Sequence, residues 1–131
     1  MNIEKSDSRL KFDLRINTMR EDTLSYYNQI TEYLLSYKYI KNRQSTRCES
    51  FRYAKNLVAK ICIGGKTLKL YLALDPNDEF FVDKKYHQRN ISATKAYEEV
   101  PCMLPIKSQL AVRKACEVID YLMTKYDTYK M

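Results

Sequence analysis

Hydrophobic and polar residues alternate most regularly between residues 57 and 74, on both sides of the glycine pair at 64–65. Alternation with period two is typical of a β-strand with one buried face. A glycine pair allows the positive φ that a tight primed turn requires, whereas inside a helix it would cost about 2 kcal/mol. The segment therefore predicts a β-hairpin with one covered apolar face, and with Lys60, Lys69 and Tyr71 on its other face.

The N-terminal half predicts a strand, a helix and a second strand. Residues 10–16 alternate in the manner of a half-buried strand. Thr18 and Glu21 fit the capping box of a helix whose apolar stripe runs to about Tyr37. Aromatic residues then alternate with polar residues toward the end of segment 41–53, and this predicts a strand that leads into the hairpin.

The C-terminal half is less regular before it becomes helical. Segment 78–99 predicts a short edge strand at Phe80–Val82 and a helical turn within 92–97. A strand is predicted at Val100–Ile106, at an edge or bulge because of its prolines. Ser108 is a good N-cap for a C-terminal amphipathic helix. The order β-α-β-β-β-β-α predicts an α+β fold, with a single antiparallel sheet and two helices packed on one face.

Length and composition are those of one globular domain. The chain has 131 residues, of which 45% are hydrophobic and 30% are charged, and this suffices for one hydrophobic core. We expect a flexible N-terminal arm at 1–9, a single domain at 10–126 and a tail at 127–131. The N-terminus lacks a signal-peptide pattern, and the apolar runs are far shorter than a membrane span. We therefore predict a cytoplasmic protein with no membrane partner.

The cysteines are spread too widely to indicate a metal site. Cys48, Cys62, Cys102 and Cys116 form no close pair, and His87 is the only histidine. Structural zinc sites have closely spaced ligand pairs. We predict no metal and no cofactor, with all four cysteines reduced in the cytoplasm and with Cys62 and Cys116 as buried thiols.

Positive charge is concentrated in the middle of the chain. The formal net charge is +7, and the segment from Lys38 to Lys69 holds nine basic residues and a single acid, Glu49. A surface of one sign attracts polyanions, although a charge run that merely solubilises the protein is the alternative. The candidate ligand-binding residues for a nucleic acid or anionic surface are Lys41, Arg43, Arg47, Arg52, Lys60, Lys69 and Tyr71.

Tyrosines form a second concentration, on and just after the predicted first helix. They are Tyr26, Tyr27, Tyr33, Tyr37 and Tyr39. Aromatic residues at this spacing pack in a core and extend their hydroxyls toward solvent. The alternative is a surface on which nucleic-acid bases stack.

Patterns for catalysis are missing from the sequence. The single histidine has no nucleophile close by in the chain, the glycine pair lies between two strands instead of before a helix, and the hairpin carries no acid. We predict a non-catalytic module that binds nucleic acid or another phosphate-rich ligand through a basic sheet face. The alternatives are a protein-interaction module, such as a mobile-element inhibitor that docks on an acidic surface of a host enzyme, and a small hydrolase or nuclease.

Short motifs over most of the chain carry a family resemblance. They are Leu34-Leu35-Ser36-Tyr37-Lys38, Lys41-x-Arg43-x-Ser45, Glu49-Ser50-Phe51, Gly65-Lys66-Thr67-Leu68, Leu70-Tyr71-Leu72-Ala73-Leu74-x-Pro76, Val100-Pro101 and Ile106-Lys107-Ser108. They resemble a family of small uncharacterised domains from low-GC Gram-positive bacteria and their mobile elements. The chain is also distantly similar to a domain of unknown function fused to predicted nucleases. The resemblance implies no established activity, and the chain departs from the family pattern at Thr46, Ala54 and Pro105.

Overall fold

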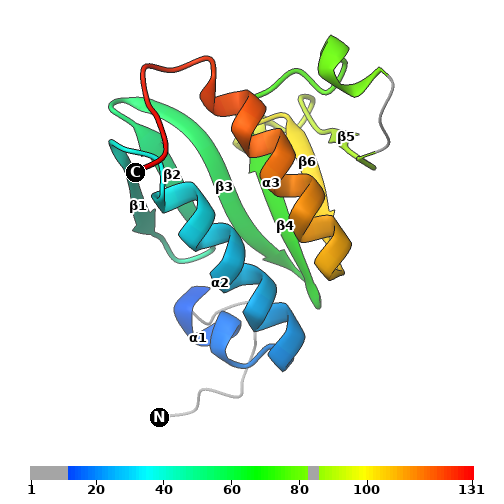
Figure 1. Cartoon of the computed structure of the whole chain (residues 1–131). Helices are drawn as coiled ribbons and strands as arrows, with labels where there is room; N and C mark the ends of the chain where they lie inside the picture. The colour runs from blue at the N-terminus through cyan, green and yellow to red at the C-terminus, as the bar shows by residue number, and fades with distance from the viewer. Residues whose placement is uncertain (1–11, 83–85) are drawn as a thin grey trace.

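An antiparallel sheet and two long helices form the framework of the protein. The computed structural model describes residues 12–82 and 86–131. The sheet has six strands in the order β1-β2-β3-β4-β6-β5 (Figure 1). The strands are β1 (Ile40–Gln44), β2 (Cys48–Tyr53), β3 (Asn56–Gly64), β4 (Thr67–Leu72), β5 (Arg89–Asn90) and β6 (Cys102–Ile106). The helices are α1 (Phe12–Asn17), α2 (Glu21–Leu35) and α3 (Gln109–Met123), with 3-10 turns η3 (Glu79–Phe81) and η4 (Lys95–Tyr97).

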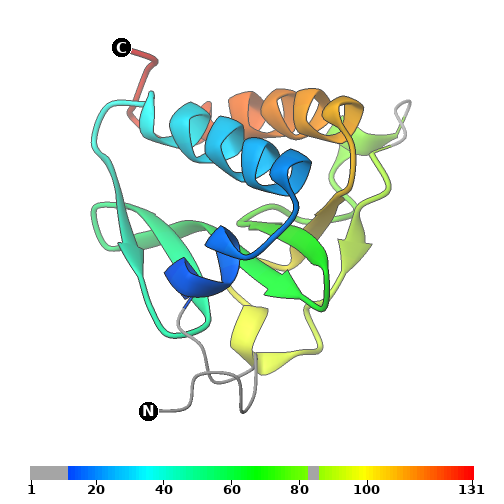
Figure 2. The ribbon, with the colours of Figure 1, turned by 90° about the horizontal axis from the view of Figure 1, so that it is seen from below.

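Helices α2 and α3 lie side by side over one face of the sheet (Figure 2), and the main core fills the space between the two layers. Ile30 and Leu34 of α2 are fully buried in the same core as the leucines of β4. The predicted α+β fold, with a single antiparallel sheet and two helices packed on one face, is confirmed. The predicted cap of α3 is also confirmed, because Ser108 Oγ accepts a hydrogen bond from the Ala111 amide at 3.1 Å.

The first predicted strand is wrong, because this segment is the short helix α1. Phe12 and Ile16 are buried, whereas Leu14 is 49% exposed. Apolar residues four apart share one side of a helix, so the alternating pattern satisfied a helix as well as a strand. The start of that predicted strand, together with the predicted arm at 1–9, lies outside the described residues.

The predicted capping box of α2 is also absent. The Thr18 hydroxyl donates a hydrogen bond to the Arg15 carbonyl at 2.8 Å. It therefore caps the end of α1 instead of the start of α2. Helix α2 begins at Glu21 after Arg20, which makes no side-chain capping hydrogen bond.

The strands follow the prediction in the hairpin and depart from it on either side. Gly65 has φ of 63° between β3 and β4, as a two-residue primed turn requires. Segment 41–53 is two strands instead of one, because a turn at 45–47 folds β1 back on β2. Residues 80–82, predicted as an edge strand, belong to η3 and its C-terminal cap.

The C-terminal residues pack back on the domain. The Lys38 amide donates to the Tyr129 carbonyl at 2.9 Å, and the Met131 amide donates to the Ser36 carbonyl at 2.8 Å. The segment predicted as a tail is therefore attached beside the end of α2. Within residues 12–82 and 86–131, no helix has the length and apolar character needed to cross a membrane.

Candidate binding face

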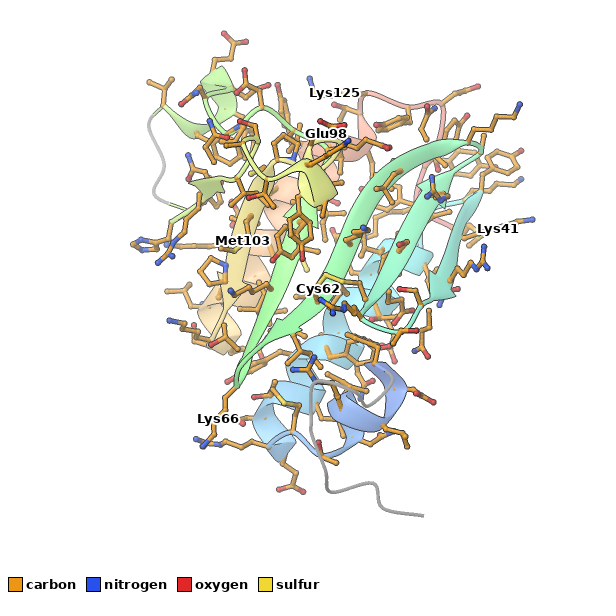
Figure 3. All side chains as sticks on the ribbon, turned by 180° about the vertical axis from the view of Figure 1, so that it is seen from behind. Lys41, Cys62, Lys66, Glu98, Met103 and Lys125 are labelled. Carbon is orange, nitrogen blue, oxygen red and sulfur yellow. A yellow bond between two sulfur atoms is a disulfide. The ribbon has the colours of Figure 1, made fainter. Side chains whose placement is uncertain are left out.

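Strand register brings most of the predicted cations to the sheet face opposite α2 and α3, which we call the outer face (Figure 3). Directly opposed residues of antiparallel strands point their side chains to the same side. Lys41 is opposite Arg52, and Arg43 is opposite Ser50. Ser50 is in turn opposite Lys60 on β3. Three adjacent strands therefore present basic side chains on one surface.

The single acid of this basic segment points the other way. Glu49 is 1% exposed and lies beneath the sheet, on the helix side. Its carboxylate accepts hydrogen bonds from the Tyr27 hydroxyl, from Asn42 Nδ2 at 2.7 Å and from Gln44 Nε2 at 3.4 Å. Burial, followed by the hydrogen bond to Glu49, raises the pKa of Tyr27 to about 12. The carboxylate is thus satisfied internally, and its charge is kept away from the outer face.

The predicted cations have no salt-bridge partner among residues 12–82 and 86–131. The salt bridges in this part of the chain join Arg20 to Asp22 and Lys125 to Asp78. Exposed cations that form no ion pair raise the local positive potential. Four of the predicted residues are exposed to solvent: Lys41, Arg43, Arg47 and Arg52.

A groove of about 370 Å³ lies between strands β1–β3 and the segment that contains η4. The sheet wall carries three of the predicted cations, Arg43, Arg52 and Lys60. The opposite wall supplies a fourth cation, Lys95, together with the carboxylates of residues 98–99. Sequence reasoning missed this second wall, because the three residues of η4 show no periodicity that would indicate where they pack.

Two predicted residues are less accessible than expected. Tyr71 lies on the outer face, but it is only 6% exposed because the Tyr97 ring stacks on it at 4.1 Å and 3°. Burial and the neighbouring Tyr97 raise the Tyr71 pKa. Lys69 is half-buried on the same face. Tyr71 is therefore not the open stacking surface that the sequence predicted, and Tyr97 lies over it beside Lys60.

A small second core explains this burial. The segment before β6 crosses the outer face over β3, β4 and β6 and covers apolar side chains there. The buried members are Cys48, Leu57, Cys62, Tyr71, Val100 and Met103. The outer face is thus divided into a covered half and the basic half over β1, β2 and β3.

Two cysteines are joined, and this corrects the prediction that all four are reduced. Cys48 and Cys62 are opposed on β2 and β3 and form a disulfide with a Cα–Cα distance of 4.5 Å. This separation is that of a non-hydrogen-bonded antiparallel pair. Cys102 and Cys116 are free thiols, and burial raises the pKa of Cys102 to about 12. The disulfide links the two strands that carry Arg52 and Lys60.

Other parts of the surface show less convergence of functional groups. His87 is exposed and lines a separate pocket with Arg89 and Lys107. Within residues 12–82 and 86–131, no group of three or more His, Cys, Asp or Glu side chains is arranged to hold a metal ion. Arg47 lies in the exposed turn between β1 and β2 and does not line the groove.

Comparisons with protein-family models, curated proteins and solved structures find no match to this chain. The family resemblance therefore stays a prediction.

Proposed function

We propose that the protein is a non-catalytic binding module whose ligand is nucleic acid or another phosphate-rich polyanion. The ligand lies along the basic half of the outer face, over β1, β2 and β3. The observation that carries the proposal is the separation of charge in this segment. Arg43, Arg52 and Lys60 converge on one groove, while Glu49 is buried on the opposite side of the sheet.

Phosphate groups suit this surface for two physical reasons. Arginine presents a planar fork that matches phosphate oxygens, and lysine adds a point charge. Neutralising phosphates also releases condensed counterions, which makes binding favourable at low salt. Ser50 places a hydroxyl among the cations of the groove, and hydroxyls commonly contact phosphate oxygens.

A protein with an acidic surface is the second candidate ligand. The carboxylates of residues 98–99 line the same groove as the cations. They repel phosphates, whereas they would accept hydrogen bonds from the polar side chains of a protein. A mixed rim of this kind is common at protein–protein interfaces.

Salt-dependent binding tests the proposal. Labelled oligonucleotides are titrated with the protein at several salt concentrations, with fluorescence anisotropy as the readout. The logarithm of affinity should fall linearly with the logarithm of salt, with a slope of about −0.7 to −0.9 per phosphate contacted. The double variant Arg52→Ala, Lys60→Ala should reduce the size of the slope by about two.

The matched control removes two cations from other parts of the surface. Arg113 is exposed on α3, and Lys66 is exposed in the β3–β4 turn. Arg113→Ala with Lys66→Ala should leave the slope unchanged. If the wild-type protein binds no single-stranded or double-stranded DNA or RNA at about 50 mM salt, the nucleic-acid proposal is wrong. Capture of one acidic protein at fixed stoichiometry, lost in the Arg52 and Lys60 variant, would then support the second candidate.

A further inference from the structure

An aromatic pocket adjoins the basic groove at the β1 edge of the sheet. It has a volume of about 490 Å³ and is lined by Tyr39, Lys41, Arg52, Tyr53 and Ala54. The Tyr39 and Tyr53 rings meet edge to face, with centroids 6.5 Å apart. Arg52 lines both the pocket and the groove. A ligand that fills both hollows therefore presents an aromatic group and an anionic group on either side of one guanidinium.

The backbone of this pocket is held in an unfavourable conformation at two positions. Tyr39 has φ of 71° and Ala54 has φ of 53°. The left-handed region crowds a Cβ atom, so residues other than glycine, asparagine and aspartate rarely occupy it. At Ala54 the two-residue turn between β2 and β3 requires a positive φ, whereas Tyr39 lies outside a hairpin turn, and strain of this kind clusters at binding sites. Here the two strained residues, which are fifteen positions apart in the sequence, line the same pocket.

Burial does not account for Tyr39. The residue is 58% exposed, so its ring gains little from the core in return for its backbone strain. Tyr27 and Tyr37 of the same tyrosine concentration are buried. A large exposed ring beside an apolar hollow and two cations is the arrangement that binds the face of a nucleic-acid base, with arginine adding a cation–π contact.

An unpaired base is the group that fits. Within a duplex both faces of each base are covered by neighbouring bases. No base ring of a duplex is therefore free to stack on Tyr39 in this pocket. In a single strand the bases can turn outward and stack on aromatic side chains while the backbone follows a basic groove. The pocket and the groove together meet both requirements.

We infer that the ligand is single-stranded nucleic acid, with its phosphates in the basic groove and one base stacked on Tyr39 in the adjoining pocket. This inference rests on the proposed function and specifies the strand state of the ligand. It moves the stacking residue from Tyr71, which Tyr97 covers, to Tyr39. Arg52 lies between the bound phosphate and the bound base.

The test uses two substitutions at Tyr39 and three probes. Tyr39→Asn removes the ring and places a residue that tolerates the left-handed region, whereas Tyr39→Phe keeps the ring. The probes are a homopolymeric pyrimidine oligonucleotide, an abasic oligonucleotide of equal length and a blunt duplex. Leu110→Ala, which removes an exposed apolar side chain from α3, is the matched control.

Tyr39→Asn should weaken binding of the pyrimidine strand about 5- to 150-fold, which corresponds to 1–3 kcal/mol for one stacked base. The salt slope should not change, because no cation is removed. The abasic strand should bind the Tyr39→Asn variant and the wild type equally. Tyr39→Phe and Leu110→Ala should keep wild-type affinity. The melting temperature of Tyr39→Asn should rise, because backbone strain is relieved while binding is lost.

The outcomes separate this inference from the proposed function. If the pyrimidine strand binds with a steep salt dependence and Tyr39→Asn binds equally well, the base pocket is wrong while the polyanion module stands. If the duplex binds as tightly as the single strand, the assignment to single strands is wrong. If none of the three probes binds at low salt, the proposed function fails and this inference fails with it.

Discussion

Replacing Glu49 by glutamine tests the separation of charge on which the binding face depends. The substitution keeps the volume of the side chain, so it creates no cavity in the layer between β2 and α2. It replaces one accepting oxygen by an amide that can only donate. The Tyr27 hydroxyl and the Asn42 amide both donate to Glu49, so one of them would have to turn its oxygen toward the new amide and give up the hydrogen bond that it donates.

The expected cost is about 2 kcal/mol of unfolding free energy. Hydrogen bonds to a charged group are worth about 1.5–3 kcal/mol each, and removing the buried charge recovers part of that loss. Exposed Glu98 provides the control, since Glu98→Gln should change stability by less than about 0.5 kcal/mol. Denaturant melts at neutral pH measure both effects.

The Tyr27 pKa provides a second readout that stability alone does not supply. Burial is the largest cause of its rise from 10.0 to about 12, and Glu49 is the next. In Glu49→Gln this pKa should fall part of the way back. Because the raised pKa stabilises the fold below pH 10 and this contribution is lost by about pH 12, the gap in stability between wild type and variant should narrow over that interval.

Alkaline titration followed by tyrosinate absorbance, combined with melts across the same interval, checks this expectation. A Glu49→Gln protein that is as stable as wild type and has the same tyrosine titration would refute the reasoning. The hydrogen bond between Tyr27 and Glu49 on the helix side would then be wrong. The inference that the Glu49 charge is kept away from the outer face would fail with it.

Three further outcomes test the framework of the sheet. Leu70→Ala should lower the unfolding free energy by about 2–5 kcal/mol because Leu70 is fully buried. Lys69→Ala should lower it less. If urea melts show the reverse ranking, the assignment of the Leu70 side of β4 to the face covered by the helices is wrong. Gly65→Val should lower the unfolding free energy by about 1–2 kcal/mol because Gly65 has positive φ. If the variant melts like the wild type, the turn between β3 and β4 has a different conformation. Reducing the bond between Cys48 and Cys62 should cost about 3 kcal/mol for a loop of about 15 residues, and equal midpoints with and without reductant would mean that the bond is absent.

The strands could be predicted where the alternation of apolar and polar residues matches the side of the sheet that is buried. In the hairpin every second residue from Leu68 to Leu72 enters the core, and Gly65 adopts the conformation that the turn requires. The same alternation assigned Lys60 and Lys69 to the outer face, and the register agrees. Period-two patterning fixes the face of a residue, so this part of the candidate site followed from the sequence.

The sequence pattern of the strands does not reveal which other segment covers the outer face of the sheet. Tyr97 reaches Tyr71 because the segment before β6 folds across the sheet, and Lys95 is carried to the groove with it. No periodicity exists in a 3-10 turn of three residues. The pairing of Cys48 with Cys62 likewise depends on the register between β2 and β3, which includes an irregularity after Phe51.

Short amphipathic segments are ambiguous in the same physical sense. Six residues make fewer than two helical turns, so the apolar residues at 12, 14 and 16 fit either period in the sequence, whereas the observed burial of Phe12 and Ile16 with Leu14 exposed fits only a helix. The Tyr39 pocket could not be predicted from the sequence, for another reason. Its backbone conformation is unusual for tyrosine, and residue type alone predicts the opposite.

Tyrosine hydroxyls explain how the protein keeps its cations available. Tyr33 and Tyr37 both donate to Asp120, at 2.6 Å and 2.5 Å, and Tyr121 donates to Asp78 at 2.8 Å. These neutral donors satisfy the Asp120 carboxylate without a lysine or arginine, whereas Asp78 also pairs with Lys125 at 3.9 Å. Acids on the helix side therefore need few salt bridges, and cations on the outer face are not drawn away from it. Four cations and the two carboxylates of residues 98–99 then line the groove, so its net charge is positive, which supports capture of a polyanion over a purely solubilising role.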